Sequence, residues 1–187
     1  WSSLGGAGSG LNSYVDAFTL YNGDLIAGGD FTGAGGDGNA DYIAKWNGTI
    51  WSSLGGAGSG LNGYVYALTV YNGDLVAGGA FSNAGGDGNA DFIAKWNGTS
   101  WSSLGGAGSG LNGYVYALTL YNGDLIAGGV FTDAGGDGNA DCIAKWNGTS
   151  WNSLGGAESG LNSTVYALTL YNGELIAGGY FTDAGGD

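Results

Sequence analysis

The chain has 187 residues, among them 44 glycines but no proline, methionine or histidine, and its formal net charge is −13 at pH 7. So acidic a surface repels nucleic-acid phosphates and anionic membranes, which argues against both as partners. A single cysteine excludes an intrachain disulfide and a cysteine-based zinc site, and no apolar run is long enough to insert into a membrane as a helix.

A period of fifty residues organises the chain. The segment WSSLGGAGSGLN begins at Trp1, Trp51 and Trp101, and returns as WNSLGGAESGLN at Trp151. This period predicts a single repeat domain over residues 1–187. Its units span residues 1–50, 51–100, 101–150 and, as a partial copy, 151–187. Copies this alike indicate recent duplication or deliberate design, and the sequence fits both.

Each unit is expected to contain four short strands. In the first copy they span residues 14–21, 24–29, 41–46 and 49–54. Asn22-Gly23 joins the first pair and Asn47-Gly48 the second, and Asn-Gly marks a tight hairpin because both residues tolerate positive φ. No helix is expected, since glycine interrupts the segments and no 3.6-residue stripe persists.

These strands lack strict alternation of apolar and polar residues. LIAGG (25–29) and YIAKW (42–46) are apolar or small at neighbouring positions, which suits a sheet covered on both faces. The predicted fold is therefore all-β, with β-propeller-type tandem repeats and four antiparallel strands in each fifty-residue blade. The paired glycines would let neighbouring blades approach closely.

The double glycine, followed by an aromatic residue and then by a tryptophan, resembles the kelch repeat. Here the pattern runs through LIAGG (25–29) and Trp51, LVAGG (75–79) and Trp101, and LIAGG (125–129) and Trp151. The chain departs from kelch by a shorter loop after the fourth strand and by an extra tryptophan at position 46. It is also similar to Gly-rich IAKWNGTSW…YNGDLIAGG repeats of bacterial secreted and surface proteins. This resemblance implies a propeller in the extracellular space or on the cell surface, without catalytic residues.

The set of strands available to the terminal blade predicts self-assembly. The terminal blade would take two strands from residues 164–181 and one from residues 1–5, without a third strand. Either a neighbouring chain supplies that strand, or the residues are a window on a longer array. Unpaired strand edges pair with further copies, and head-to-tail contacts give rings or filaments.

An acidic loop recurs in every complete copy. DAGGDGNAD (133–141) resembles the calcium loop of integrin-type propeller repeats, although Gly135 replaces one ligand. The candidate calcium ligands are Asp37, Asp41, Asp87, Asp91, Asp133, Asp137 and Asp141. The alternative is a solvated loop in which Asp and Asn side chains cap their own turn, with no cofactor.

Four asparagines fit the N-glycosylation pattern: Asn47, Asn97, Asn147 and Asn162. The first three also occupy predicted hairpin turns, which explains them without an attached sugar.

A few positions vary within an otherwise constant repeat. Asp30, Ala80, Val130 and Tyr180 share one position, and Asp16 stands where the other copies have tyrosine. We expect these side chains to face solvent, a channel or a partner, because a uniform core would not accept this range. Cys142, at the position of Tyr42 and Phe92, is expected to be a buried filler. The tryptophans recur at fixed repeat positions, and so does the tyrosine at position 21. We expect these aromatic side chains to pack between blades, and the alternative is that they stack on sugars.

Enzymatic activity is not expected. There is no histidine to act as a base, and an Asp37–Asp41 pair present in every complete copy suggests a structural or metal role rather than a single active site. The leading hypothesis is a non-enzymatic extracellular or cell-surface structural protein that self-associates into a ring or filament. The alternatives are a glycan-binding, adhesive (lectin-like) propeller and a designed consensus propeller with no natural ligand.

Overall fold

A computed structural model describes residues 4, 10–56, 60–106, 110–155 and 160–184. The described residues form an all-β structure with three short 3-10 turns and no α-helix. The first sheet holds β1 (Val15–Tyr21), β2 (Asp24–Gly29), β3 (Ile43–Trp46) and β4 (Trp51–Ser52), with η1 (Ala34–Gly36) in a loop. The second holds β5 (Tyr64–Tyr71), β6 (Asp74–Ala80), β7 (Ile93–Trp96) and β8 (Trp101–Ser102), with η2 (Ala84–Gly86). The third holds β9 (Val115–Tyr121), β10 (Asp124–Gly129), β11 (Ile143–Trp146) and β12 (Trp151–Asn152), with η3 (Ala134–Gly136). The fourth holds β13 (Val165–Tyr171) and β14 (Glu174–Gly179).

Within each sheet the strands are hydrogen-bonded in chain order and antiparallel. Asn22 and Gly23 take positive φ values of 51° and 90°, which confirms the predicted hairpin between β1 and β2. The fourth strand is shorter than predicted, because β4 spans only Trp51–Ser52. The strand predicted over residues 1–5 falls on a segment of which only Leu4 is described.

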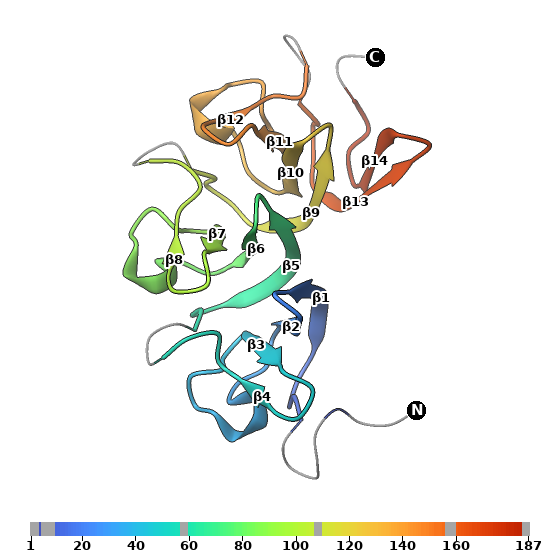
Figure 1. Cartoon of the computed structure of the whole chain (residues 1–187). Coiled ribbons are helices and arrows are strands. Elements are labelled where there is room, and N and C mark those ends of the chain that lie inside the picture. The colour runs from blue at the N-terminus through green and yellow to red at the C-terminus, as the bar shows by residue number, and fades with distance from the viewer. Residues whose placement is uncertain (1–3, 5–9, 57–59, 107–109, 156–159, 185–187) are drawn as a thin grey trace.

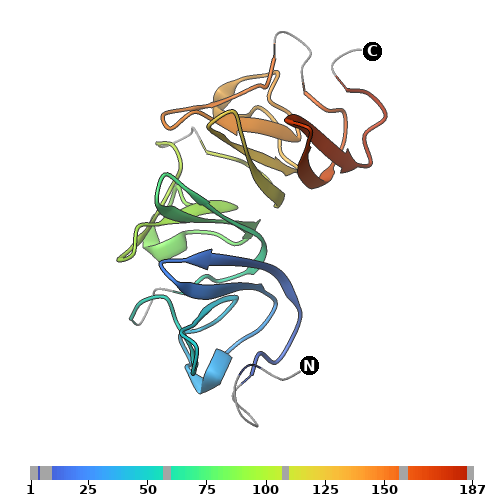
Figure 2. The same cartoon turned by 45° about the vertical axis from the view of Figure 1, so that its right-hand side comes forward.

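The sheets follow one another along a curved row. Their first strands, β1, β5, β9 and β13, lie side by side, and the short strands β4, β8 and β12 lie farthest from them (Figure 1). The first and fourth sheets are at opposite ends of the row (Figure 2). Every internal sheet therefore has a neighbour on each face, as the apolar strands predicted.

Glycine makes the close packing of neighbouring sheets feasible. A Cβ atom added to Gly28 of β2 would lie 2.5 Å from Val65 Cγ1 of the next sheet. The equivalent Cβ atoms at Gly78 and Gly128 would lie 2.6 Å from the next valine. Real Cβ atoms do not approach other heavy atoms so closely, so the prediction that glycine allows close approach is confirmed.

Buried tryptophans belong to the hydrophobic cores built around the first three sheets. Trp46 and Trp51 face each other across β3 and β4 with ring centroids 5.5 Å apart, and Trp51 is buried. Trp151 donates its indole N–H to the Leu104 carbonyl oxygen at 3.0 Å, linking the third sheet to the chain that leaves the second. Cys142 is buried, which confirms its predicted filler role, and burial raises the pKa of its thiol.

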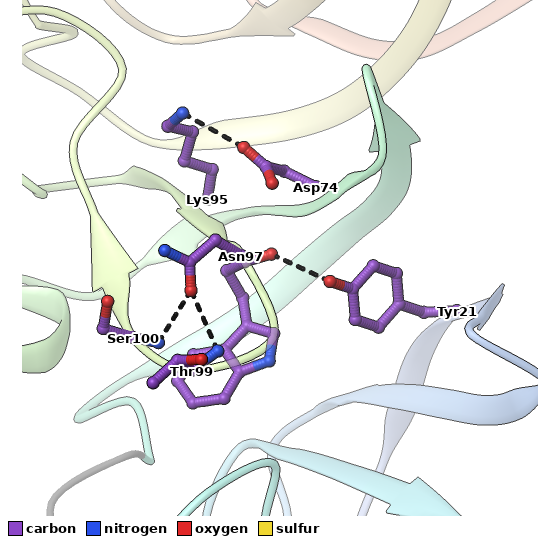
Figure 3. A network of polar contacts seen from close by, with 7 residues as sticks. Tyr21, Asp74, Lys95, Asn97, Thr99 and Ser100 are labelled. Carbon is purple, nitrogen blue, oxygen red and sulfur yellow. Dashed lines mark hydrogen bonds and ion pairs between the residues drawn. The ribbon is translucent and has the colours of Figure 1, made fainter.

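A tyrosine links the first two sheets. The Tyr21 hydroxyl donates to the Trp96 carbonyl oxygen at 3.4 Å, and Figure 3 shows its side chain pointing toward the turn at Asn97. Lys95 of the same region forms an ion pair with Asp74 at 3.0 Å (Figure 3). Over the part of the chain that the structure describes, no helix is long and apolar enough to cross a membrane.

Candidate functional sites

The first sheet presents an apolar face that has no neighbouring sheet among the described residues. We call Val15, Phe18 and Leu20 of β1 the leading face. Phe18 is 56% exposed and Leu20 is 70% exposed. Their counterparts Leu68 and Val70 pack in the core between the first and second sheets. The leading face therefore has the chemistry of an internal sheet interface, but Phe18 and Leu20 are exposed and Val15 is only half-buried, against the core of its own sheet.

The fourth sheet presents the complementary face. We call Tyr171, Ile176 and Gly178 the trailing face. Ile176 is 44% exposed, whereas its counterpart Ile126 is fully buried. Tyr171 is 68% exposed, whereas Tyr21 at the same repeat position is 8% exposed. Residues that are buried inside the row are thus exposed at its end.

Gly178 shows the same contrast. Among the described residues, the only heavy atom within 4 Å of a Cβ added there is Ala167 Cβ, in the same sheet and 4.0 Å away. At the internal counterparts of Gly178 this space holds a valine of the next sheet. Within the described residues β14 pairs only with β13, whereas β10 pairs with strands on both sides. Within the described part of the chain, the trailing face is therefore uncovered, and β14 beside it has one unpaired edge.

The acidic loops direct their carboxylates at backbone N–H groups. Asp37 accepts from Asn39 N at 3.0 Å and from Ser53 N at 2.9 Å, which ties the loop to the chain after β4. Asp41 accepts from Gly33 N at 2.7 Å, across the same loop. The corresponding pairs recur in the other two complete copies, at Asp87 and Asp91 and at Asp137 and Asp141.

These contacts are the ones expected when Asp side chains cap their own loop. Among the described residues no three His, Cys, Asp or Glu side chains gather closely enough to hold a metal ion. Asp133 contributes its backbone N–H to Asp141 at 2.8 Å. Calcium binding by these loops stays a prediction, and backbone carbonyl oxygens would have to supply much of its coordination.

We expect the loops to stay folded without calcium, because backbone N–H groups already donate hydrogen bonds to the carboxylate oxygens. The thermal midpoint should be the same in excess EDTA and in millimolar calcium. A bound ion would stabilise the folded state by linkage, so a midpoint that rises with calcium concentration would contradict this expectation. Magnesium at the same concentration controls for ionic strength.

The pKa values of the capping carboxylates predict a specific acid sensitivity. Backbone N–H groups of Ser53 and Asn39 lower the pKa of Asp37 from 3.8 to about 2. Similar hydrogen bonds lower the pKa of Asp87 and Asp137. A lowered pKa in the folded state means that the charged form stabilises the fold. This contribution is complete above pH 3.8 and is lost as the pH falls toward about 2.

The triple variant Asp37→Asn, Asp87→Asn, Asp137→Asn should therefore unfold at a lower temperature at neutral pH. Each amide places an NH₂ group against a backbone N–H that needs an acceptor. Between pH 4 and pH 2 the variant should lose less stability than the parent chain, as measured by circular dichroism melts. Parallel pH curves for the two proteins would count against the capping role, and Asp124→Asn outside these loops serves as the control.

The predicted glycosylation residues all have local structural roles. The Asn47 side-chain oxygen accepts from the N–H groups of Thr49 and Ile50, at 2.9 and 3.0 Å. Figure 3 shows the same turn at Asn97, with Thr99 and Ser100, and Asn147 repeats it. Asn162 donates its amide N–H to Thr182 Oγ1 at 3.0 Å. Glycosylation at these four positions stays a prediction.

The variable position lies where the second strand of each sheet ends, beside a row of tyrosines. We call Tyr66, Tyr116 and Tyr166 the tyrosine row. They lie on the neighbouring strands β5, β9 and β13, and successive ring centroids are 5.2 and 5.1 Å apart. Tyr180 packs edge-on against Tyr166 at 5.3 Å. Asp16 occupies the position equivalent to the tyrosine row in the first copy. Burial, followed by the charge of Asp30, raises the pKa of Asp16.

Ala80 and Asp30 are half-buried, whereas Val130 and Tyr180 are exposed. The variable residues thus differ in environment as well as in chemistry. Sequence reasoning did not single out Tyr64 and Tyr114, because no local pattern shows that they meet residues of other repeats. Tyr64 approaches Tyr42 at 5.9 Å and Tyr114 approaches Phe92 at 5.8 Å between ring centroids.

The repeated sheets define this chain as an all-β tandem-repeat protein. No protein-family model matches it, and no curated protein matches it either. The leading face, the trailing face and the acidic loops are therefore the features from which a function can be inferred.

Proposed function

We propose that this chain is a non-enzymatic structural protein whose copies assemble head to tail. The leading face of one copy packs on the trailing face of the next, and the assembly continues the row of sheets. The supporting observation is the repeated internal interface, in which a valine and an aliphatic side chain of one sheet fill the space over a glycine of the preceding sheet.

The two open faces have matching parts. Val15 and Phe18 of the leading face occupy the repeat positions of Val65 and Leu68, which pack over Gly28. Gly178 of the trailing face occupies the position of Gly28 and is open. A second copy is therefore the occupant that fits, because its leading face repeats an interface already present three times in the row.

Such a contact is heterologous, since it joins two different surfaces. Heterologous contacts close into a ring when the rotation between copies permits it and otherwise give filaments. The sheets would then be blades of a propeller-type arrangement, with their inner strands around a common axis. The resemblance to surface-protein repeats favours an extracellular or cell-surface location.

Size-exclusion chromatography with light scattering over a concentration series tests this proposal. We expect the mass to rise above that of one 18.5 kDa chain as concentration increases. Because each copy carries a formal charge of −13, assembly should strengthen with salt. The screening length falls from about 10 Å at about 0.1 M salt to about 3 Å at about 1 M. A strict monomer under all these conditions would refute the proposal.

A further inference from the structure

A pocket of about 510 Å³ opens beside the tyrosine row, away from both end faces. Its main lining residues are Tyr42, Tyr64, Tyr66, Tyr114, Asn62 and Ala80. Three successive sheets contribute to it, so the pocket exists only when the repeats are stacked. Its volume is within the range of small-molecule sites, about 300–1,000 Å³.

The protein holds these side chains in place with local contacts. Tyr42 has a φ of 60°, which is unusual for an aromatic residue, and its N–H donates to the Phe31 carbonyl oxygen at 2.8 Å. Asn62 is oriented by two hydrogen bonds with Ser82, at 2.9 and 3.2 Å. Tyr64 lies between Tyr42 and Tyr66, with ring centroids 5.9 and 6.2 Å away.

The variable repeat position explains why the second repeat is suited to a ligand. Ala80 is the smallest of the four residues at this position and lines the pocket. The other copies place a carboxylate, a branched aliphatic side chain or a tyrosine there. The neighbouring copy also has Phe92 in place of Tyr42 and Thr164 in place of Tyr114, which removes two of the tyrosines.

We propose that this pocket binds a neutral saccharide. Aromatic rings offer flat apolar surfaces for the C–H faces of a sugar ring, and the tyrosine hydroxyls and Asn62 offer donors and acceptors for its hydroxyls. Among the described residues no charged side chain lines the pocket, and the acidic surface disfavours anionic ligands. A tyrosine hydroxyl is protonated at neutral pH and can donate, and burial, followed by the neighbouring Tyr116, moves the pKa of Tyr66 further upward. This inference is independent of head-to-tail assembly.

Saturation-transfer NMR with D-glucose, D-galactose, D-mannose and N-acetylglucosamine, each tested separately, would measure the binding. Ala80→Tyr introduces the residue of the fourth copy and fills the pocket, while Tyr64→Ala removes a stacking surface that is already partly exposed. For a sugar that binds, each change should weaken affinity by about tenfold or more. Tyr14→Ala, at the same repeat position but outside the pocket, should leave affinity unchanged.

Tyrosine faces also attract cations, so the pocket could instead be a cation site. Binding of tetramethylammonium, measured in the same way, distinguishes this interpretation from sugar binding. Binding of this cation without binding of any sugar would overturn the proposal. So would the absence of signal from all four sugars, or sugar affinity unaffected by both pocket variants. Ala80→Tyr enlarges a side chain and Tyr64→Ala truncates one. If Ala80→Tyr misfolds, the sugar affinity of Tyr64→Ala still tests the proposal.

Discussion

Replacing Gly178 with valine should convert the assembled protein into folded monomers. The added side chain occupies the surface on which the leading face of the next copy is proposed to pack. Among the described residues of its own chain the substitution meets open space, with Ala167 Cβ at 4.0 Å, and Gly178 does not need a positive φ. Light scattering should give the mass of one chain, while the circular dichroism spectrum stays that of the parent.

Gly128→Val is the matched control for this prediction. It makes the same change at an internal interface, where even a Cβ would lie 2.6 Å from Val165 Cγ1. Overpacking of this kind costs about 1–3 kcal/mol, so Gly128→Val should lower the stability of the chain itself. If Gly178→Val assembled as the parent does, the trailing face would not be the site of contact.

Truncating Ile126 to alanine should destabilise the fold by about 2–5 kcal/mol. Ile126 is fully buried against Val165 in the interface between the third and fourth sheets, so its loss leaves a cavity. Ile176→Ala removes the same atoms at the equivalent repeat position. Because Ile176 is 44% exposed, this change should cost the monomer less than about 1 kcal/mol.

Urea denaturation of both variants in the monomeric Gly178→Val background measures this difference. In the parent background, Ile176→Ala should instead weaken assembly, because the proposed contact buries this side chain. Equal destabilisation of the monomer by the two substitutions would contradict the different environments assigned to them.

The repeat and its hairpins could be predicted from the sequence because their signals are local. Asn22-Gly23 specifies a turn through two adjacent residues. The double glycine before Asp30 indicates close packing between neighbouring sheets. The length of the fourth strand could not be predicted, since it depends on pairing with β3 beyond Trp51. The 3-10 turn at Ala34–Gly36 was also missed, because glycine-rich loops give no periodic signal.

The candidate sites were less accessible to sequence reasoning. The spacing of Asp37 and Asp41 suggested calcium, but nothing local shows that Asp37 reaches Ser53, sixteen residues away. The tyrosine pocket depends on contacts between repeats: strands β3 and β4 and the loop after β4 separate Tyr42 from Tyr64 along the chain. The only sequence feature that pointed to this pocket was the variation among repeats at the position of Ala80. That variation indicated a functional position but not its ligand.

Cysteine trapping tests head-to-tail assembly most directly. With Cys142 replaced by phenylalanine, the residue of the second copy, one variant carries Val15→Cys and another Gly178→Cys. At the equivalent internal contact, a Cβ on Gly28 lies 3.0 Å from Val65 Cβ, close enough for a disulfide after a small shift. We expect mild oxidation to give covalent dimers from the mixture of variants and not from either alone. Cross-linking of either variant with itself, or no cross-linking in the mixture, would contradict the proposed assembly.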